Sequence, residues 1–413
     1  MTQKTGNEAF PELMSPISFG RLTASNRVVH QPMECDDSPN GFPSESTFRR
    51  YRRLAEGGAG ITVVEATSVG KDRARINQLM VDEDHRQGIE SLTKAFKDIN
   101  SEPLLFYQIT HAGQISGDFD RSGVPKSEVV RVYESAGFDR KPGRLLSSAD
   151  IDEIIEAFIK GAMIAHDSGA DGVDVKLCHG YLGGQLLRPA NNRDWEYGGS
   201  LENRMRFPER VITGIKEKLP DFCVMVRFSI DEGDRTKDDE PVTGGIGTKG
   251  YDSTEHSLEE PLEIIRMLKD YGIDILNLTA GIPAYNADKW VRPAKPPAGF
   301  DVDDPDTYTK YHHFAYSLEA KKLNLGIPVI GSGFSVFGKN MAQVGDSVIK
   351  HGLADMIGIG RQSLADPNVE RILSGEADYC VRCSGCAKLL VGQVAVGCSH
   401  YDQDTKERLR QLR

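Results

Sequence analysis

The sequence contains no apolar run that approaches the roughly 18 residues needed to cross a bilayer. Its first residues, MTQKTGNEAF, lack the charged, apolar and cleavage regions of a signal peptide. Basic residues are in the minority, since 50 Lys and Arg stand against 61 Asp and Glu, and the net charge is -11. This balance argues against a nucleic-acid or anionic-membrane surface, because phosphate binding relies on clustered Lys and Arg. We therefore expect a cytoplasmic protein that acts on small molecules.

Internal sequence repeats and low-complexity tracts are also absent, and no segment has the context of a Rossmann unit. One formal G-x-G-x-x-G match, GIGTKG at 245–250, lies in a polar loop. A dinucleotide fingerprint instead needs a strand before it and a helix after it. What the chain does have is size: 413 residues with 39% hydrophobic and 27% charged content can bury a large core.

Apolar runs alternate with amphipathic stretches along most of the chain. Eight runs have the composition of buried strands, and they lie at 27–33, 60–69, 103–110, 172–177, 223–229, 274–279, 328–333 and 354–360. The clearest helix pattern covers 147–169, where Ser147 and Asp150 form a capping-box signal and Gly169 ends the helix. Parallel strands buried on both faces read as Val/Ile/Leu-rich runs. The pattern therefore predicts a (β/α)₈ TIM barrel, with a doubly wound sheet as the alternative.

Polar residues recur at the carboxyl ends of the predicted strands, where the side chains of a barrel converge on one pocket. These residues are Glu65, Thr67, Gln108, His111, Lys176, His179 and Arg227. Any one of them alone is compatible with loop chemistry or helix capping. Their joint recurrence predicts an active site at that end, to which the long polar segments 110–147 and 230–257 also belong.

Glycines mark the ends of the last two predicted strands, with GSG at 331–333 and GIGR at 358–361. Backbone N–H groups freed by glycine approach a phosphate closely, and barrels often bind phosphate in these two loops. Tight barrel turns also need glycine. The two loops together, with Arg361 attached, nevertheless favour a phosphate site, because a guanidinium makes bidentate charged contacts.

The segment RPANNRDWEYGGSLENRMRF at 188–207, preceded by HGYL at 179–182, resembles the loop after strand four in the old yellow enzyme family of FMN-dependent oxidoreductases. Further motifs follow the family's order: NRVVHQPM from 26, VVEATSV from 63, YQITHAG from 107, VRFS from 226, IPVIGSGF from 327 and ADMIGIGRQSLADP from 354. The resemblance covers roughly residues 10–370.

The resemblance implies bound FMN, which agrees with the glycine loops. The cofactor-binding residues that it implies are Pro32, Met33, Ala66, Gln108, Arg227, Gly331, Gly333, Gly360 and Arg361. Among them, Gln108 would hydrogen-bond the flavin pyrimidine. Arg227 would place a cation beside its N1 and C2 oxygen, which stabilises the reduced, anionic flavin.

Family chemistry passes a hydride from the flavin to the β-carbon of an activated alkene, and a tyrosine adds a proton at the α-carbon. Tyr181 occupies that tyrosine position, and a phenol with an unperturbed pKa of about 10 is protonated at neutral pH. Two donors three residues apart hold the substrate carbonyl in the family, and here they are Lys176 and His179. Lys176 replaces the usual His, and a cationic donor favours a carboxylate, a thioester or another electron-rich carbonyl. The family's redox-tuning position after Pro-Met is also altered, with Glu34 there and Cys35 next to it.

Four of the seven cysteines lie near the C-terminus, and they are Cys380, Cys383, Cys386 and Cys398. In a reducing compartment, clustered cysteines are more often metal ligands or redox groups than disulfides. Three closely spaced thiolates with a distant fourth suit a [4Fe-4S] cluster. Zinc is the alternative, with His400 as an extra ligand nearby. The same spacing class follows the barrel in the iron–sulfur subgroup that includes dienoyl-CoA reductase, enoate reductases and trimethylamine dehydrogenase.

We therefore expect an FMN-binding barrel at 1–372 and a [4Fe-4S] segment at 373–413. The expected activity is ene-reduction of an α,β-unsaturated carbonyl, carboxylate or acyl-thioester. Amine dehydrogenation or demethylation and a non-catalytic electron-transfer subunit are the alternatives. Longer members of the subgroup continue into flavin and nicotinamide domains, whereas this chain stops at Arg413. Electrons are then expected from a separate protein or subunit, unless NAD(P)H reduces the FMN directly, and a homo-oligomer is expected.

Overall fold

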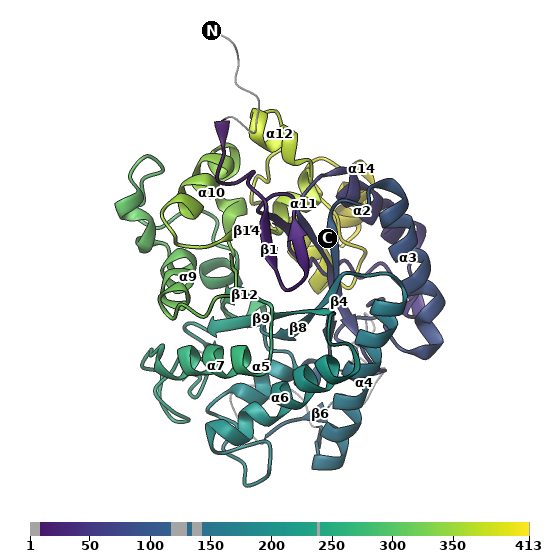
Figure 1. Ribbon diagram of the computed structural model, residues 1–413, viewed down its shortest axis with the longest axis vertical. Coiled ribbons are helices and arrows are strands. Elements are labelled where there is room, and N and C mark those ends of the chain that lie inside the picture. The colour runs from purple at the N-terminus through teal and green to yellow at the C-terminus, as the bar shows by residue number, and fades with distance from the viewer. Residues whose placement is uncertain (1–8, 117–129, 134–142, 238–239, 413) are drawn as a thin grey trace.

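Eight parallel strands pair side by side in chain order and close into a barrel (Figure 1). They are β3 (Val28–His30), β4 (Ile61–Ser68), β5 (Leu104–Thr110), β8 (Gly172–Leu177), β9 (Cys223–Asp231), β12 (Ile275–Ala280), β13 (Val329–Gly331) and β14 (Met356–Ile359). Each predicted run overlaps one of these strands, and β9 and β12 extend one or two residues beyond their runs, so the predicted TIM barrel is confirmed. The structure, a computed structural model, describes residues 9–116, 130–133, 143–237 and 240–412.

Helices cover the outside of the barrel between successive strands (Figure 1). The main ones are α2 (Glu45–Glu56), α3 (Arg86–Ile99), α4 (Ser148–Asp167), α6 (Leu201–Lys218), α7 (Glu259–Asp270), α9 (His312–Lys322) and α10 (Met341–Lys350). The predicted capping box at the start of α4 is present, because the Ser147 hydroxyl accepts from the Asp150 N–H and the Asp150 carboxylate accepts from the Ser147 N–H. Within the described residues, no helix combines the length and apolarity that crossing a membrane requires.

Shorter elements lie at both ends of the barrel. Three two-stranded pairs are β1 (Ile17–Phe19) with β2 (Leu22–Ala24), β6 (Val130–Arg131) with β7 (Arg144–Leu145), and β10 (Thr236–Lys237) with β11 (Glu240–Pro241). The shorter α-helices are α5 (Leu182–Leu187), α8 (Pro283–Asn286), α11 (Arg361–Ala365), α12 (Val369–Ser374), α13 (Gly385–Val391) and α14 (Gln403–Gln411). The 3₁₀ and π turns are η1 (Pro39–Gly41), η2 (Glu83–His85), η3 (Gly113–Ile115), η4 (Ala287–Val291), η5 (Pro305–Lys310) and η6 (Phe334–Asn340). α12 crosses the domain boundary predicted after residue 372.

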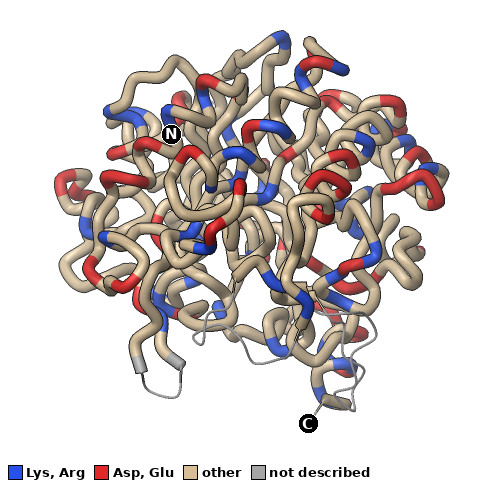
Figure 2. Tube along the Cα trace, turned by 90° about the horizontal axis from the view of Figure 1, so that it is seen from below, with Lys and Arg blue, Asp and Glu red and all other residues tan. Residues whose placement is uncertain are grey.

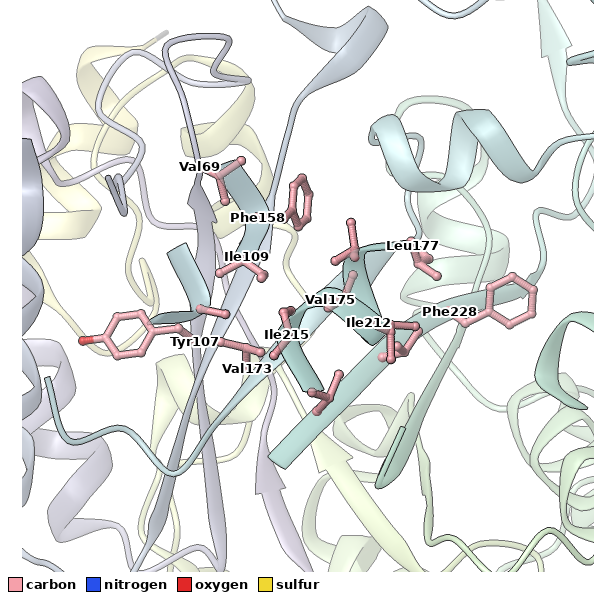
Figure 3. Close-up of a cluster of buried hydrophobic side chains, with 14 of the residues drawn as sticks. Val69, Tyr107, Ile109, Phe158, Val173, Val175, Leu177, Ile212, Ile215 and Phe228 are labelled. Atoms are coloured by element: carbon pink, nitrogen blue, oxygen red, sulfur yellow. The ribbon is translucent and has the colours of Figure 1, made fainter. Parts of the chain in front are cut away.

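The barrel strands are buried on both faces, and every residue of β4 and β9 is buried. Their outward side chains pack against the surrounding helices in one cluster. In Figure 3, Val173 and Val175 of β8 lie among Phe158 of α4 and Ile212 and Ile215 of α6. Burial on both faces explains why these strands read as continuous β-branched and apolar runs in the sequence.

Inside the barrel, apolar side chains fill the half nearest the amino ends of the strands. Phe106 occupies the space beside Gly172, where a Cβ would lie 2.2 Å from the Phe106 ring. Phe19 and Ala24 of the β1–β2 hairpin join the same cluster and cover this end. The interior is therefore a packed core, and a ligand cavity belongs at the carboxyl ends of the strands.

A recurring ion pair ties the strands together at their amino ends. Lys216 of α6 contacts Asp274 at 2.6 Å, and the same carboxylate accepts from the Val224 N–H of β9 at 2.8 Å. The Asp274 N–H donates back to the Val224 carbonyl at 2.8 Å. We call this arrangement a Lys–Asp clamp. Two further clamps consist of Lys97, Asp171 and Leu105, and of Lys321, Asp355 and Val329.

Asn26 connects β3 and β4 in a similar way without a charge. Its Oδ1 accepts from the Val28 N–H at 3.1 Å and from the Gly60 N–H at 2.8 Å, and its Nδ2 donates to the Gly58 carbonyl. Gly60 leaves no room for a side chain, because a Cβ there would lie 2.1 Å from the Asn26 carbonyl oxygen. The amide therefore fixes the distance between the starts of these two strands.

Asp274→Ala is expected to destabilise the fold by about 2 kcal/mol, because the Lys216 ammonium and the Val224 N–H lose a charged partner. The free energy of unfolding in urea measures this cost. Asp98→Ala is the matched control, since it breaks the exposed Lys94–Asp98 pair of 2.6 Å. That control should cost less than about 1 kcal/mol, and equal costs for the two variants would contradict a structural role of the clamp.

Candidate active site

One cavity of about 440 Å³ lies at the carboxyl ends of the barrel strands. Residues in or just after most strands line it, among them Gln31, Pro32, Met33, Glu34, Gln108, Lys176, Arg227, Thr279, Ser332, Gly333, Gly358, Gly360 and Arg361. The C-terminal segment forms another part of the wall with Cys386, Ala387, Leu390, Gln393 and Val396. The cavity therefore occupies the position where barrels place their active sites.

The cavity brings together most of the predicted site residues. Those that line it are Pro32, Met33, Gln108, Lys176, His179, Tyr181, Arg227, Gly333, Gly360, Arg361 and Cys386. The predicted site residues outside this lining are Ala66, Gly331, Cys380, Cys383 and Cys398, and the strand-end residues Glu65, Thr67 and His111 also lie outside it. Ala66 is fully buried in β4, where its carbonyl accepts a hydrogen bond from the Gln78 amide at 2.8 Å. At Gly331, a Cβ would meet Ser317 and Ala354 at 3.3 Å.

A buried polar group lies where β5, β8 and β9 run side by side. Gln108 Nε2 donates to Asp174 Oδ2 at 2.7 Å. Burial raises the pKa of Asp174 to about 6, against the opposing charge of Arg227. Asp174 Oδ1 and Arg227 Nε have no hydrogen-bond partner within the described residues. Buried atoms of this kind point to a bound ligand or water, and Arg227, which lines the cavity, can meet an electron-rich ligand atom there.

The loops after β13 and β14 form a second part of the cavity wall. Gly333 has a φ of 90°, a left-handed conformation that glycine adopts without strain. Arg361 is buried and donates to the Pro293 carbonyl at 3.2 Å. Arg292 also lines the cavity, although the sequence did not predict it. The charges of Arg361 and Arg292 both act to lower the pKa of the Cys386 thiol. Two arginines beside glycine-rich loops are a donor set that fits the phosphate of FMN.

Glu34 connects three polar side chains on one wall of the cavity. Its Oε1 accepts from Lys176 Nζ at 2.7 Å and from the Tyr181 hydroxyl, and its Oε2 lies 3.6 Å from Arg75 Nε. Burial acts to raise the pKa of Glu34, but the charges of Lys176 and Arg75 outweigh burial and bring the pKa to about 2. Burial and the charge of Glu34 raise the pKa of Tyr181 well above its ordinary value. The cluster therefore holds an ionised carboxylate against a neutral phenol.

His179 lies in a left-handed turn with a φ of 59°. Its Nε2 hydrogen-bonds the Thr279 hydroxyl at 3.1 Å. Burial, with the charges of Arg227 and Lys176, lowers the pKa of His179 well below its usual value, so its imidazole is neutral at pH 7. The two predicted donors, Lys176 and His179, are thus held by separate hydrogen bonds.

The segment 188–207, which carries the clearest sequence motif, lies outside the cavity lining and holds a helix of the cavity wall in place. None of its residues is among the described residues that line the cavity. Arg188 is fully buried and donates to both carboxylate oxygens of Glu232 at 2.8 to 2.9 Å. Asn191 Nδ2 donates to the carbonyls of Leu186 and Tyr197 at 2.9 and 2.6 Å. These contacts fix the end of α5, the helix that begins directly after Tyr181.

The four predicted metal ligands are Cys380, Cys383, Cys386 and Cys398, and all are free thiols in the C-terminal segment. Burial raises the pKa of both Cys386 and Cys398, and the charge that Cys380 carries when ionised raises both pKa values further. The thiols therefore lie within electrostatic reach of one another. Arg382 and Ser384, on either side of the exposed Cys383, have left-handed φ values of 58° and 57°. Within the described ranges, no three His, Cys, Asp or Glu side chains converge on a single metal-ion position.

Residues 12–248 match the NADH:flavin oxidoreductase / NADH oxidase family. Two curated relatives are NADH oxidase of Thermoanaerobacter brockii, 30% identical over 386 residues, and cinnamate reductase of Clostridium sporogenes, 27% identical over 402 residues. These matches cover 91% and 94% of this chain but 53% and 56% of the relatives, so the chain spans about half their length. The 2-naphthoyl-CoA reductase complex with 2-naphthoyl-CoA has a similar fold, with a TM-score of 0.76 and 21% identity over 97% of this chain and 58% of that one.

A closed parallel barrel with a basic, glycine-lined cavity at its carboxyl end is an arrangement that suits a phosphate-bearing ligand. The chain belongs to the NADH:flavin oxidoreductase / NADH oxidase family. The resemblance to the old yellow enzyme family is thereby confirmed.

Arg361→Met is expected to weaken FMN binding about tenfold to a hundredfold, because a charged hydrogen bond contributes about 1.5–3 kcal/mol. Riboflavin binding should change far less, since riboflavin lacks the phosphate. Quenching of flavin fluorescence on titration with apoprotein measures both dissociation constants. Arg382→Met, which removes a guanidinium bonded to the Val336 carbonyl outside the cavity lining, is the control. Equal weakening of both flavins by Arg361→Met would remove Arg361 from the phosphate site.

Proposed function

We propose that this chain reduces the C=C bond of an α,β-unsaturated carboxylate or a related acyl compound. FMN would occupy the cavity, and a [4Fe-4S] cluster in the C-terminal segment would relay electrons to it. The observation that carries the proposal is the neutral phenol of Tyr181 beside the ionised Glu34, in a cavity that also fits a phosphate-bearing flavin. A positioned phenol supplies the proton that reduction of a C=C bond requires.

Gln108, Arg227, Arg292 and Arg361 are the polar residues that would hold the flavin, with Gly333 and Gly360 leaving room for its phosphate. Bound FMN supplies a hydride and exchanges single electrons with the cluster. Arg227 Nε, buried and without a partner among the described residues, contributes positive charge that favours a reduced, anionic flavin.

The remaining chemistry belongs to side chains of this chain. Tyr181 donates its hydroxyl proton to the substrate α-carbon. His179 is neutral, so one ring nitrogen carries a proton, and it can donate a hydrogen bond to the acyl oxygen. Thr279 orients the imidazole through its hydrogen bond of 3.1 Å. These groups polarise the acyl group and complete the proton transfer.

Charge in the cavity favours an anionic substrate over an amine. Among the described lining residues Glu34 is the one acidic side chain, against the basic Arg75, Lys176, Arg227, Arg292 and Arg361. Elsewhere on the chain the two signs are interspersed, as Figure 2 shows. Arg75 Nε and both side-chain amide atoms of Gln114 are buried without a hydrogen-bond partner in the described residues. A substrate carboxylate could accept hydrogen bonds from Arg75 Nε and Gln114 Nε2. Cinnamate, the substrate in the name of one relative, is an unsaturated carboxylate.

The position of the cysteines supports the electron relay. Cys386 lines the same cavity as the proposed flavin ligands. In a cubane each thiolate binds a different iron, so the four sulfurs do not meet at one point as zinc ligands do. The left-handed residues on either side of Cys383 turn the backbone sharply there. A separate electron-transfer protein or subunit, or NAD(P)H acting directly at the FMN, is the proposed source of electrons.

Reduced protein is expected to be reoxidised faster by cinnamate than by its methyl ester, because five basic side chains and one acidic side chain line the described cavity. Arg75→Met should lower this preference about tenfold to a hundredfold, the effect of one charged hydrogen bond. Arg75→Lys, which keeps the charge, should retain part of it. Anaerobic stopped-flow absorbance of the flavin measures both rates. Reoxidation by iminium compounds alone would support amine oxidation instead, and no reoxidation by any of these compounds would support an electron-transfer subunit.

Purified protein is expected to contain about four iron and four sulfide ions per chain, the content of one cubane. Cys398→Ser should lose most of this iron, because the distant fourth ligand closes the site. Cys223→Ala is the control, since Cys223 lies in β9 within the barrel core and should leave the iron content unchanged. Metal analysis and anaerobic absorbance give the result, and zinc without iron would reject the electron relay.

A further inference from the structure

Glu34 is an acidic residue in an otherwise basic cavity, and its contacts differ from those of a simple ion pair. One oxygen, Oε1, accepts hydrogen bonds from both Lys176 Nζ and the Tyr181 hydroxyl. The side chains of Glu34 and Lys176 are 13% and 3% exposed, so water screens these contacts little. The carboxylate thus joins a cation and a phenol at one atom.

The contacts of Lys176 indicate a role through Tyr181. The ammonium donates to Glu34 at 2.7 Å and lies 3.3 Å from the centre of the Tyr181 ring. An ammonium has three N–H donors, so these contacts do not prevent a direct bond to a substrate oxygen. They also place positive charge against the phenol, where negative charge would develop if Tyr181 lost its proton.

Charged groups around Tyr181 act in opposite directions. Glu34, after β3, opposes ionisation of the phenol, whereas Arg75, after β4, favours it, and Lys176 of β8 lies against the ring. Cys178, the other titratable group facing the phenol, is a buried thiol whose pKa is raised to about 12 by burial. The charge of Asp36 interacts with the charges of Glu34 and Arg75, and its carboxylate accepts a hydrogen bond from the Asn77 N–H at 2.7 Å. Removal of the Glu34 charge would leave the two cations unopposed at the phenol.

We propose that Glu34 is a positioning residue that holds the Tyr181 hydroxyl and the Lys176 ammonium on one carboxylate oxygen. Tyr181 thereby remains a protonated donor until negative charge develops on the substrate. The proposal rests on the proposed function for the identity of the proton acceptor. The contacts among the three side chains are independent of it.

The proton transfer balances as follows. Reduced FMN would supply the hydride for a C–H bond at the substrate β-carbon, and the electron pair of the C=C bond would move to the α-carbon and acyl oxygen. That pair then forms the second C–H bond as the O–H bond of Tyr181 breaks. The tyrosinate that remains, beside Lys176 and Arg75, regains a proton from water.

Glu34→Gln tests the proposal, because it keeps the size and hydrogen-bonding capacity of the side chain and removes its charge. The Tyr181 phenol should then ionise at a pH about one unit or more below that of the wild type, since a like charge has been removed and two cations remain. Ultraviolet absorbance of tyrosinate measures this, as the difference between each protein and its Tyr181→Phe counterpart. The alkaline limb of the pH profile of kcat should shift in the same direction.

Two further variants separate the outcomes. Asp36→Asn removes a neighbouring carboxylate that does not bond Tyr181, and the titration of Tyr181 should stay unchanged. Glu34→Asp keeps the charge on a shorter side chain, so its titration should fall between those of wild type and Glu34→Gln, and it serves as the test if Glu34→Gln does not fold. A wild-type titration in both Glu34 variants would overturn the proposal. A shifted titration without turnover of any unsaturated acyl compound would reject the proposed function and leave the role of Glu34 standing.

Discussion

Pairing of β14 with β3 closes the barrel, and the active site depends on this closure. Ile359 lies opposite His30, and the Gln31 N–H donates to the Ile359 carbonyl at 3.0 Å. The chain leaving β3 therefore runs beside the chain leaving β14. The C-terminal segment attaches at the same place, because the Val396 N–H donates to the Cys35 carbonyl at 2.8 Å. One closing contact thus brings Glu34, the glycine-containing loop after β14 and the cysteine-rich segment to a common wall.

The chemistry of that wall follows from how charge is distributed in a buried space. Several cations in a cavity of about 440 Å³ repel one another and attract anions, which suits a flavin phosphate and a substrate carboxylate. Glu34 is the local exception. Its carboxylate stays ionised because Lys176 and Arg75 are close, and it in turn keeps the phenol of Tyr181 neutral. The proposed proton donor and an electron-rich ligand can then share one cavity.

The fold and much of the cavity lining were predictable because both depend on patterns that are local in sequence. Buried parallel strands have a characteristic composition, and Tyr181 and Arg227 occupy motif positions. The Glu34–Lys176 pair was not predictable, because the two residues are 142 positions apart and no local sequence pattern relates them. Arg75 and Arg292 lie in loops, where packing alone decides which side chains reach the cavity. Asp174 did carry a signal, an acidic residue inside an apolar strand.

The Lys–Asp clamps and Asn26 occur once for every two strands. They join β5 to β8, β9 to β12 and β13 to β14, and Asn26 joins β3 to β4. The base of the barrel thus consists of four strand pairs with nearly equivalent contacts. The amino-acid sequence itself shows no matching internal repeat. Among the described residues of the opposite rim, each strand pair contributes different side chains to the cavity. The contacts that align the strands lie at their amino ends, whereas the cavity lies at their carboxyl ends. The loops around the cavity can therefore change in sequence without disturbing the alignment of the strands.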